Sequence, residues 1–291
     1  MTNSFRRWFI VTSSFTVAGI ILGLIFSWLV GGALCAPANH PVSPPIDLAV
    51  EDVVFHSESG STIKGWLVNS TTNRGVIILQ HGIRADKSTL VNRAKLFSQA
   101  GYAVLLFDFQ AHGESIGKRI TMGFLESRDS QAAVDFVKKR FPRKPIAVLG
   151  VSLGAAAAAL ANPPLDVQAL VLEMPFSTVV EATKDRIELR LGSCARILSP
   201  LLTLQIPLRT GCAVDDLRPM ISVEKITVPK LFLHGSEDRE TKFSEAKDIF
   251  AHAAAPKTLV SFLGARHEDF LQFDPIKYKP LVLNFLADHL K

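Results

Sequence analysis

Ser152 stands at the centre of a Gly-x-Ser-x-Gly pattern, LGVSLG, which a run of alanines follows. The preceding residues, PIAVL, are typical of a short buried strand, whereas the alanines favour a helix. Ser152 is therefore expected at a sharp strand-to-helix turn that exposes its hydroxyl, with glycines at 150 and 154 because bulkier neighbours would clash. Free N–H groups at the start of the helix would favour an anion beside the serine. Ser152 is thus a candidate nucleophile.

A serine hydroxyl needs a base to take its proton and an acid to orient that base. His267, in LGARHEDF, follows the last apolar run of the chain, and Asp238, in LFLHGSEDRE, follows the run before it. The carboxyl ends of parallel strands meet at one edge of a sheet, so both loops should open where Ser152 lies. The chain order serine, aspartate, histidine is also typical of such a site.

Other residues compete for these roles. Glu237 is next to Asp238, and Glu173 ends an earlier apolar run, so either could supply the acid. Asp238 could instead cap a helix, and His267 could be a solvated loop histidine. Two further histidines precede glycines at strand ends and are interpreted as structural residues that bind loop backbone: His81 and His234.

The elements that must position these residues alternate along the chain. Short runs that are apolar throughout indicate buried strands of a parallel sheet, at 75–80, 102–108, 145–150, 167–174, 229–235 and 258–264. Amphipathic stretches of helical length separate most of them, at 89–100, 124–140 and 242–251. EDVVFHS and TIKGWLVNS predict a hairpin before them. The pattern predicts an α/β fold with a doubly wound, mostly parallel sheet.

Residues 176–223 interrupt this alternation without a clear strand, and we expect them to form a helical cap over the site. The middle of this insertion, ILSPLLTLQIPL, is apolar. We interpret it as the core face of a cap helix, because apolar stripes are usually buried. The alternative is an apolar wall for an acyl chain, with nearby arginines close to a lipid or substrate carboxylate: Arg190, Arg196 and Arg209.

The N-terminal part of the chain has no Asp, Glu, Lys or Arg from Trp8 to Ile46. Its apolar stretch is long enough to cross a hydrocarbon core of about 30 Å as a helix, and longer than the roughly 7–15 apolar residues of a signal peptide. We therefore predict a retained anchor over residues 1–34. A cleaved signal, with secretion of the remainder, is the alternative, since APA at 36–38 resembles a cleavage site. Arg6 and Arg7 would keep the N-terminus cytoplasmic and place the rest of the chain on the other side of the membrane.

Residues 35–49 contain four prolines within CAPANHPVSPPID and are predicted to form a stiff, extended linker. At about 3.3 Å per residue, a dozen such residues would reach about 40 Å. The domain after this linker, residues 50–291, would then stay close to the bilayer.

Composition excludes some classes of protein. The 291 residues are 48% hydrophobic and 20% charged, with a net charge of +5, which fits one large domain with an appendage. Basic and aromatic residues do not interleave, so nucleic-acid binding is not expected. The cysteines lack metal-ligand spacing, and no metal or cofactor is expected. Cys194 and Cys212 are interpreted as ordinary thiols, with a disulfide as the alternative.

From about Val50 to Lys291, the chain resembles the α/β-hydrolase superfamily, above all its Bem46-like group and its serine aminopeptidase–monoacylglycerol-lipase-like group. QHGIRADK (80–87) is similar to the His-Gly oxyanion loop, and DFQAHGES (108–115) to the D-x-R-G-H-G-x-S segment, with Gln-Ala in place of Arg-Gly. The resemblance implies that Ile83 and Leu153 donate backbone N–H groups to an oxyanion. It also implies acyl transfer through Ser152 without a cofactor.

These observations predict a membrane-anchored serine hydrolase that cleaves a carboxylic ester of a small-molecule or lipid-like substrate. A peptidase or a thioesterase would use the same three residues. A non-catalytic scaffold that binds a ligand or a partner is a further alternative, because function lies in the site and not in the fold.

Overall fold

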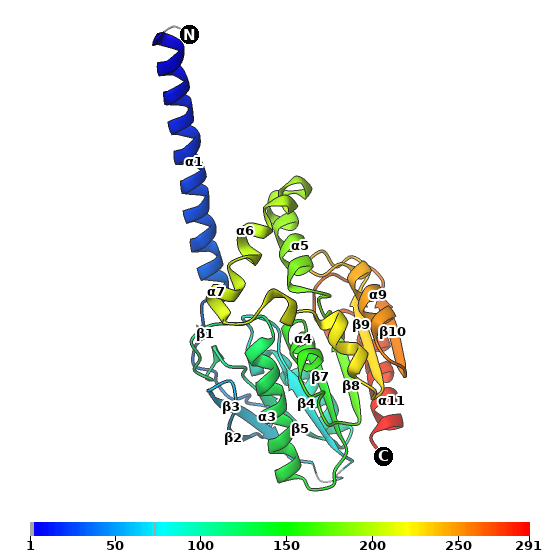
Figure 1. Ribbon diagram of the computed structural model, residues 1–291. Helices are drawn as coiled ribbons and strands as arrows, with labels where there is room; N and C mark the ends of the chain where they lie inside the picture. The colour runs from blue at the N-terminus through cyan, green and yellow to red at the C-terminus, as the bar shows by residue number, and fades with distance from the viewer. Residues whose placement is uncertain (1–2, 71, 73) are drawn as a thin grey trace.

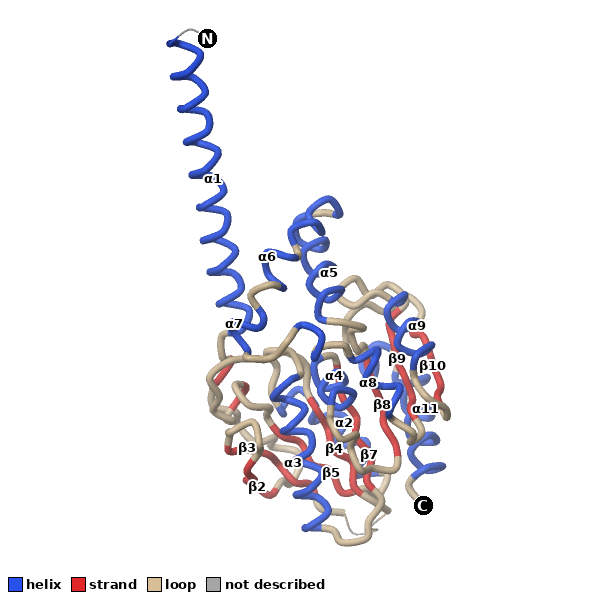
Figure 2. Tube along the Cα trace, viewed as in Figure 1, coloured by secondary structure: helices blue, strands red, loops and turns tan. Residues whose placement is uncertain are grey.

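The computed structural model describes residues 3–70, 72 and 74–291. A long helix, α1 (Asn3–Cys35), projects from an α/β body in which helices cover both faces of a sheet (Figures 1 and 2). The side chains of Arg6 and Arg7, on which the predicted orientation in the membrane depends, lie outside the described residues.

The sheet has eight strands in the order β10-β9-β8-β7-β4-β5-β3-β2. β3 pairs antiparallel with β2 and with β5, and the other pairs are parallel. This mostly parallel arrangement confirms the predicted fold class. The strands are β2 Glu51–His56, β3 Thr62–Val68, β4 Val76–Gln80, β5 Ala103–Phe107, β7 Ile146–Val151, β8 Ala169–Glu173, β9 Lys230–Gly235 and β10 Lys257–Phe262.

Helices cover both faces of the sheet, which is why its central strands are buried along their whole length and mostly apolar. One face packs against α3 (Phe124–Arg140), α4 (Leu153–Leu160) and α9 (Phe243–His252). The other packs against α2 (Val91–Gln99) and α11 (Pro275–His289), and α10 (Phe270–Phe273) precedes α11. The small side chains of α4 are buried, so this helix lies close against the sheet.

The segment between β8 and β9 is built from helices and turns, and its first part stands above the sheet edge (Figure 1). Its elements are α5 Val179–Leu191, η2 Ser193–Leu198, α6 Pro200–Thr203, α7 Ile206–Thr210, η3 Val214–Asp216, α8 Pro219–Ser222 and η4 Val223–Lys225. We call residues 176–223 the cap. Cys194 is exposed in η2, Cys212 is buried, and both are free thiols.

The interpretation of ILSPLLTLQIPL as the core face of the cap is wrong for most of its large apolar residues. Ile206 belongs to a small buried cluster, but Ile197, Leu204 and Leu208 are 82%, 73% and 76% exposed. The α6 and α7 helices are too short to bury a continuous stripe. The sequence pattern predicted an apolar surface and could not show what that surface contacts.

The segment after α1 does not hang free as a tether. Ala38–Asn39 (β1) pairs in parallel with His112–Gly113 (β6), and the Asn39 side chain donates to backbone carbonyls of residues 112, 113 and 115. Val42 and Leu48 then pack against the core. The prolines keep this segment extended because they cannot join a helix interior, but its polar groups find partners on the body. A free reach of about 40 Å therefore does not apply.

Candidate active site

Ser152 lies at the turn between β7 and α4 with backbone angles φ 52° and ψ −108°, which are unusual for a residue other than glycine. A Cβ added at Gly150 would lie 2.4 Å from the carbonyl carbon of Gly154. A Cβ added at Gly154 would lie 2.4 Å from the carbonyl oxygen of Gln80. Both glycines are therefore required by the close approach of this turn to its surroundings.

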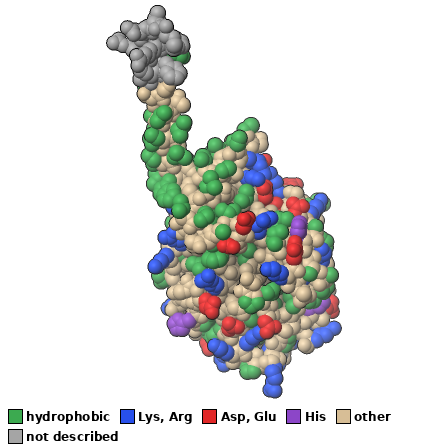
Figure 3. Space-filling view, in the orientation of Figure 1, with side chains coloured by type: hydrophobic (Ala, Val, Ile, Leu, Met, Phe, Trp, Pro, Cys, Tyr) green, Lys and Arg blue, Asp and Glu red, His purple; other side chains and the backbone are tan. Residues whose placement is uncertain are grey.

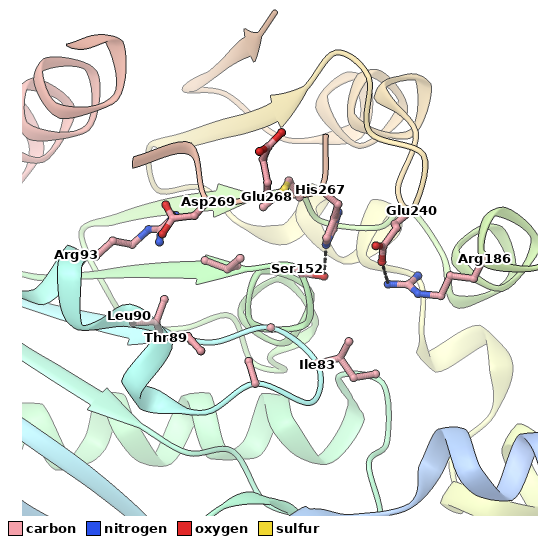
Figure 4. A pocket seen from close by; sticks show the side chains of 14 residues that line it. Ile83, Thr89, Leu90, Arg93, Ser152, Arg186, Glu240, His267, Glu268 and Asp269 are labelled. Carbon is pink, nitrogen blue, oxygen red and sulfur yellow. Dashed lines mark hydrogen bonds and ion pairs between the residues drawn. The ribbon is translucent and has the colours of Figure 1, made fainter. Parts of the chain in front are cut away.

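The structure brings together the three residues that sequence patterns selected. His267 Nε2 lies 3.0 Å from Ser152 Oγ (Figure 4). On the other side of the ring, His267 Nδ1 lies 2.7 Å from Asp238 Oδ2. The three come from loops that follow β7, β9 and β10, at the carboxyl edge of the sheet. A serine, an imidazole and a carboxylate in this order can transfer the serine proton to the imidazole.

Asp238 is held in the orientation that His267 needs. Its Oδ1 accepts the backbone N–H groups of Glu240 at 2.8 Å and Thr241 at 3.0 Å, and its Oδ2 accepts the Thr241 hydroxyl at 2.9 Å. Burial alone would raise the pKa of Asp238, but the hydrogen bonds from His267 and Thr241 lower that pKa below its ordinary value. The ionised carboxylate favours a proton on His267 Nδ1, which leaves Nε2 free to accept.

Glu173, the rival acid, is occupied elsewhere. Its buried carboxylate accepts Arg93 Nη2 at 2.7 Å and the Tyr278 hydroxyl at 2.5 Å, and Arg93 also pairs with Asp269 at 3.0 Å. Asp238, not Glu173, therefore lies against His267. Sequence reasoning missed Arg93 and Asp269, although Asp269 is only two residues from His267. No local pattern on α2 could have indicated Arg93.

The loop that carries Ile83 faces Ser152 across the site (Figure 4). A Cβ at Gly82 would lie 3.6 Å from the Ser152 Cβ, so the loop backbone runs close to the nucleophile. Leu153 is the first residue of α4, and its N–H has no partner within that helix. The two proposed oxyanion donors therefore come from segments that meet at Ser152.

His81 and His234 bind loop backbone, as interpreted from the sequence. His81 Nδ1 lies 2.7 Å from the Gly82 carbonyl, and its Nε2 accepts the Phe109 N–H at 3.1 Å. Burial lowers the pKa of His81 to about 3, so the ring stays neutral. His234 Nε2 lies 2.6 Å from the Thr241 carbonyl, and burial also lowers the pKa of His234.

Known proteins share this fold and parts of this sequence. Residues 71–210 match the family described as serine aminopeptidase, S33. The chain is 29% identical over 239 residues to the uncharacterized protein YqkD of Bacillus subtilis (strain 168), covering 80% of this chain and 78% of YqkD. The esterase Pf2001 of Pyrococcus furiosus superposes with a TM-score of 0.71 and 23% identity, over 88% of this chain and 100% of the esterase. The chain belongs to the α/β-hydrolase superfamily.

A relative with a named lipase activity is also similar to this α/β hydrolase. The lysophosphatidylserine lipase ABHD12 of Danio rerio is 26% identical over 235 residues, which cover 74% of this chain and 58% of that lipase. The named activities among these similar proteins are thus an esterase and a lipase activity.

The two loop segments that resemble the superfamily are joined by a buried ion pair that sequence reasoning missed. Lys87 Nζ lies 2.6 Å from Asp108 Oδ2 and 2.6 Å from Glu114 Oε2. Gln110, which replaces the usual arginine, donates to Glu126 Oε1 at 2.8 Å. Ala111, which replaces the usual glycine, adopts a positive φ of 59°. In this α/β hydrolase the Gln110 amide thus has a buried partner, and Ala111 takes the left-handed backbone region that favours glycine.

A cavity of about 290 Å³ opens beside Ser152 and His267. Arg186, on α5 of the cap, lies 3.7 Å from Glu240 at this cavity (Figure 4). Two other cap arginines are bound elsewhere: Arg196 pairs with acidic residues of α5, and Arg209 contacts α1. Neither Arg196 nor Arg209 lines the cavity, so neither is placed to bind a substrate carboxylate there, and the alternative of a nearby lipid stays a prediction. The lining includes Ile83, Leu90, Val151 and Met174.

Proposed function

We propose that this α/β hydrolase is a membrane-anchored serine hydrolase that cleaves a carboxylic ester. The observation that carries the proposal is the hydrogen-bonded series Ser152–His267–Asp238 beside a cavity. The small volume of the cavity suits a short acyl group or the end of a longer one. The similarity to a lysophosphatidylserine lipase supports a lipid-like ester.

The proposed reaction proceeds by acyl transfer in two steps. His267 Nε2 takes the proton of Ser152 Oγ as that oxygen attacks the ester carbonyl carbon, and the imidazolium then gives the proton to the departing alkoxide, which leaves as an alcohol. Water enters, loses a proton to His267 and attacks the acyl-serine, and the imidazolium then returns the proton to Ser152 Oγ as the carboxylic acid leaves. The N–H groups of Ile83 and Leu153 would bind the developing oxyanion. The loss of one such donor typically costs about 3–4 kcal/mol of barrier height.

Amide hydrolysis is the second candidate, and the match to the serine aminopeptidase family favours it. Glu240, Glu268 and Asp269 line the cavity and could hold a peptide N-terminal ammonium group. A panel of p-nitrophenyl esters and aminoacyl p-nitroanilides distinguishes the two reactions. An aminopeptidase would cleave the anilides with the higher kcat/KM.

Replacement of the nucleophile tests the proposal. We expect the full chain in detergent to hydrolyse short p-nitrophenyl esters and to react with a fluorophosphonate probe. Ser152→Ala should abolish the labelling and lower kcat by at least about a thousandfold, because the nucleophile is lost. Ser88→Ala, which changes an exposed serine of the short 3-10 helix Lys87–Leu90, should keep both the labelling and the hydrolysis. Equal, slow hydrolysis by wild type and Ser152→Ala would show that the triad assignment is wrong.

We propose that α1 is a single-pass anchor, with the catalytic body on the non-cytoplasmic side. The window Thr12–Cys35 has a mean hydropathy of 2.2, and only 11% of it is buried, which suits a helix in lipid. A signal sequence would have a similar composition, and its cleavage would release a secreted body.

A further inference from the structure

The last third of α1 is joined to the cap by polar side chains and glycines. Ser27 Oγ donates to the Leu201 carbonyl at 2.8 Å, and Gln205 Nε2 lies 3.0 Å from Ser27 Oγ. A Cβ added at Gly31 would lie 2.4 Å from Gln205 Oε1, so the missing side chain lets α7 approach. Small residues and interhelical hydrogen bonds of this kind hold helices together in lipid. α1 and the cap therefore form one unit.

Trp28 lies on the part of α1 that contacts the cap, and its position indicates where α1 would leave the hydrocarbon core. The Arg209 guanidinium lies over the Trp28 ring, 4.0 Å from its centroid, and donates to the Trp28 carbonyl. Trp8 lies 20 positions earlier on the same helix. At about 1.5 Å per residue the two tryptophans are about 30 Å apart, the thickness of a hydrocarbon core, and tryptophan favours the two interfaces. Trp28 and Arg209 thus lie at the level expected for a bilayer surface.

The cap presents a patch of exposed apolar side chains next to this level. Figure 3 shows apolar side chains running from α1 onto the top of the cap. A contiguous apolar patch of this kind marks an interaction site. We call the patch the cap apolar face, and its members are Leu189, Leu191, Ile197, Leu198, Leu201, Leu204 and Leu208.

The acidic residues Asp185 and Glu188 of α5 are paired with basic side chains. Arg196 pairs with Asp185 at 2.5 Å and with Glu188 at 2.6 Å. Lys242, at the start of α9, pairs with the same Asp185 at 3.2 Å and Glu188 at 2.6 Å. These ion pairs neutralise Asp185 and Glu188 through Arg196 within the cap and Lys242 on the body, whereas Arg190 is exposed between Leu189 and Leu191. A basic side chain beside apolar ones suits the headgroup region of a bilayer.

We propose that the cap apolar face is embedded in the headgroup–acyl boundary of the bilayer that α1 crosses. The proposal rests on the proposed anchor and deepens the proposed function. The hydrogen bonds of Ser27 with Leu201 and Gln205 join the cap to α1, so membrane contacts through α1 and through the cap together would set the tilt of the body. The cavity that Arg186 of the cap helps to line then opens close to the bilayer, so the substrate class is an acyl ester drawn from the membrane.

Depth-dependent fluorescence quenching tests the proposal with the full chain in phosphatidylcholine–phosphatidylglycerol vesicles. The native Cys194, exposed in η2, can carry a bimane label after Cys35→Ala and Cys212→Ala. In a cysteine-free chain, Leu204→Cys gives a second cap position, Ile21→Cys a position in α1, and Val54→Cys an exposed control on β2.

We expect brominated lipids to remove about half or more of the emission at Cys194, Leu204→Cys and Ile21→Cys, since an interfacial helix lies about 5–10 Å into the acyl boundary. The emission at Val54→Cys should not change. Quenching at Ile21→Cys without quenching at either cap position would overturn the inference and leave the anchor intact. The absence of quenching at Ile21→Cys would overturn the anchor as well.

A second copy of the chain is the competing occupant of the cap apolar face. It would shift the emission of the cap labels to shorter wavelength without lipid quenching, and this outcome would overturn the proposal. The Cys194 measurement adds no substitution to the cap apolar face, so a folding defect caused by Leu204→Cys would not affect it. Neither lipid quenching nor the emission wavelength depends on ester hydrolysis. A result that overturns the membrane contact of the cap is therefore distinct from a result that overturns the Ser152 assignment.

Discussion

Asp238 binds His267 through one carboxylate oxygen and accepts two backbone N–H groups through the other. This arrangement keeps the carboxylate ionised despite its burial. Glu237, one residue earlier, has its backbone N–H bonded to the Ala265 carbonyl, so the turn that presents Asp238 is itself tied to the loop that carries His267. The proposed acid and base are therefore positioned as one unit.

Asp238→Asn should lower kcat by roughly 10³–10⁴-fold with little change in KM, because an amide does not select the imidazole tautomer that accepts the serine proton. Steady-state hydrolysis of a short p-nitrophenyl ester measures the change. Glu237→Gln is the matched control and should stay within about threefold of wild type, a change of less than 1 kcal/mol. A larger loss for Glu237→Gln than for Asp238→Asn would move the acid to Glu237.

The cap is attached to the body through α9 as well as through the chain. Glu245, in the first turn of α9, accepts the Ser177 N–H at 2.8 Å and the Ser177 hydroxyl at 2.5 Å, just before α5 begins. Burial raises the pKa of Glu245 to about 7, and the neighbouring Asp185 acts in the same direction. Because the folded-state pKa exceeds the ordinary value of 4.5, the folded chain binds more protons than the unfolded chain between these pH values.

The contribution of Glu245 to stability is therefore complete below about pH 4.5 and lost as the pH rises to about 7. We expect the free energy of unfolding to fall by roughly 1–3 kcal/mol over this range, and Glu245→Gln to remove most of that dependence. Urea unfolding in detergent at several pH values measures it. Glu224→Gln, which changes an exposed residue, should keep the wild-type dependence of the unfolding free energy on pH. The same dependence in Glu245→Gln would show that Glu245 is not its source.

The whole molecule consists of an α/β body, a cap and a helix that is joined to both. The Ile120 N–H donates to the Cys35 carbonyl, and the Ala38 N–H donates to the Ala111 carbonyl, so the body holds the chain directly after α1. The cap holds α1 itself at Ser27. In the proposed membrane-anchored state, these contacts, and not the length of a linker, set the position of the body relative to the bilayer.

Alkaline phosphatase fused after Lys291 should be active in a bacterial host, because the proposed orientation places the C-terminus outside the cytoplasm. The protein should also stay in the membrane fraction after a high-salt wash, since an apolar helix is not released by screening of charge. An inactive fusion would reverse the orientation. A soluble mature form that begins near Asn39 would show that α1 is a cleaved signal.

The sequence alone determined the parallel sheet, Ser152 at its turn and the loops that hold Asp238 and His267, because apolar runs and glycines near a nucleophile are local signals. Glu173 remained a rival until Arg93, 80 positions away in the chain, was seen to bind it. The sequence also did not reveal the hydrogen bond between Ser27 and Gln205, which are 178 positions apart, or the exposure of the cap leucines. Only the tertiary structure decided these points. The free energy of a contact depends on the distance between two residues in space, and residues far apart in the chain carry no local sequence pattern that indicates whether they are in contact.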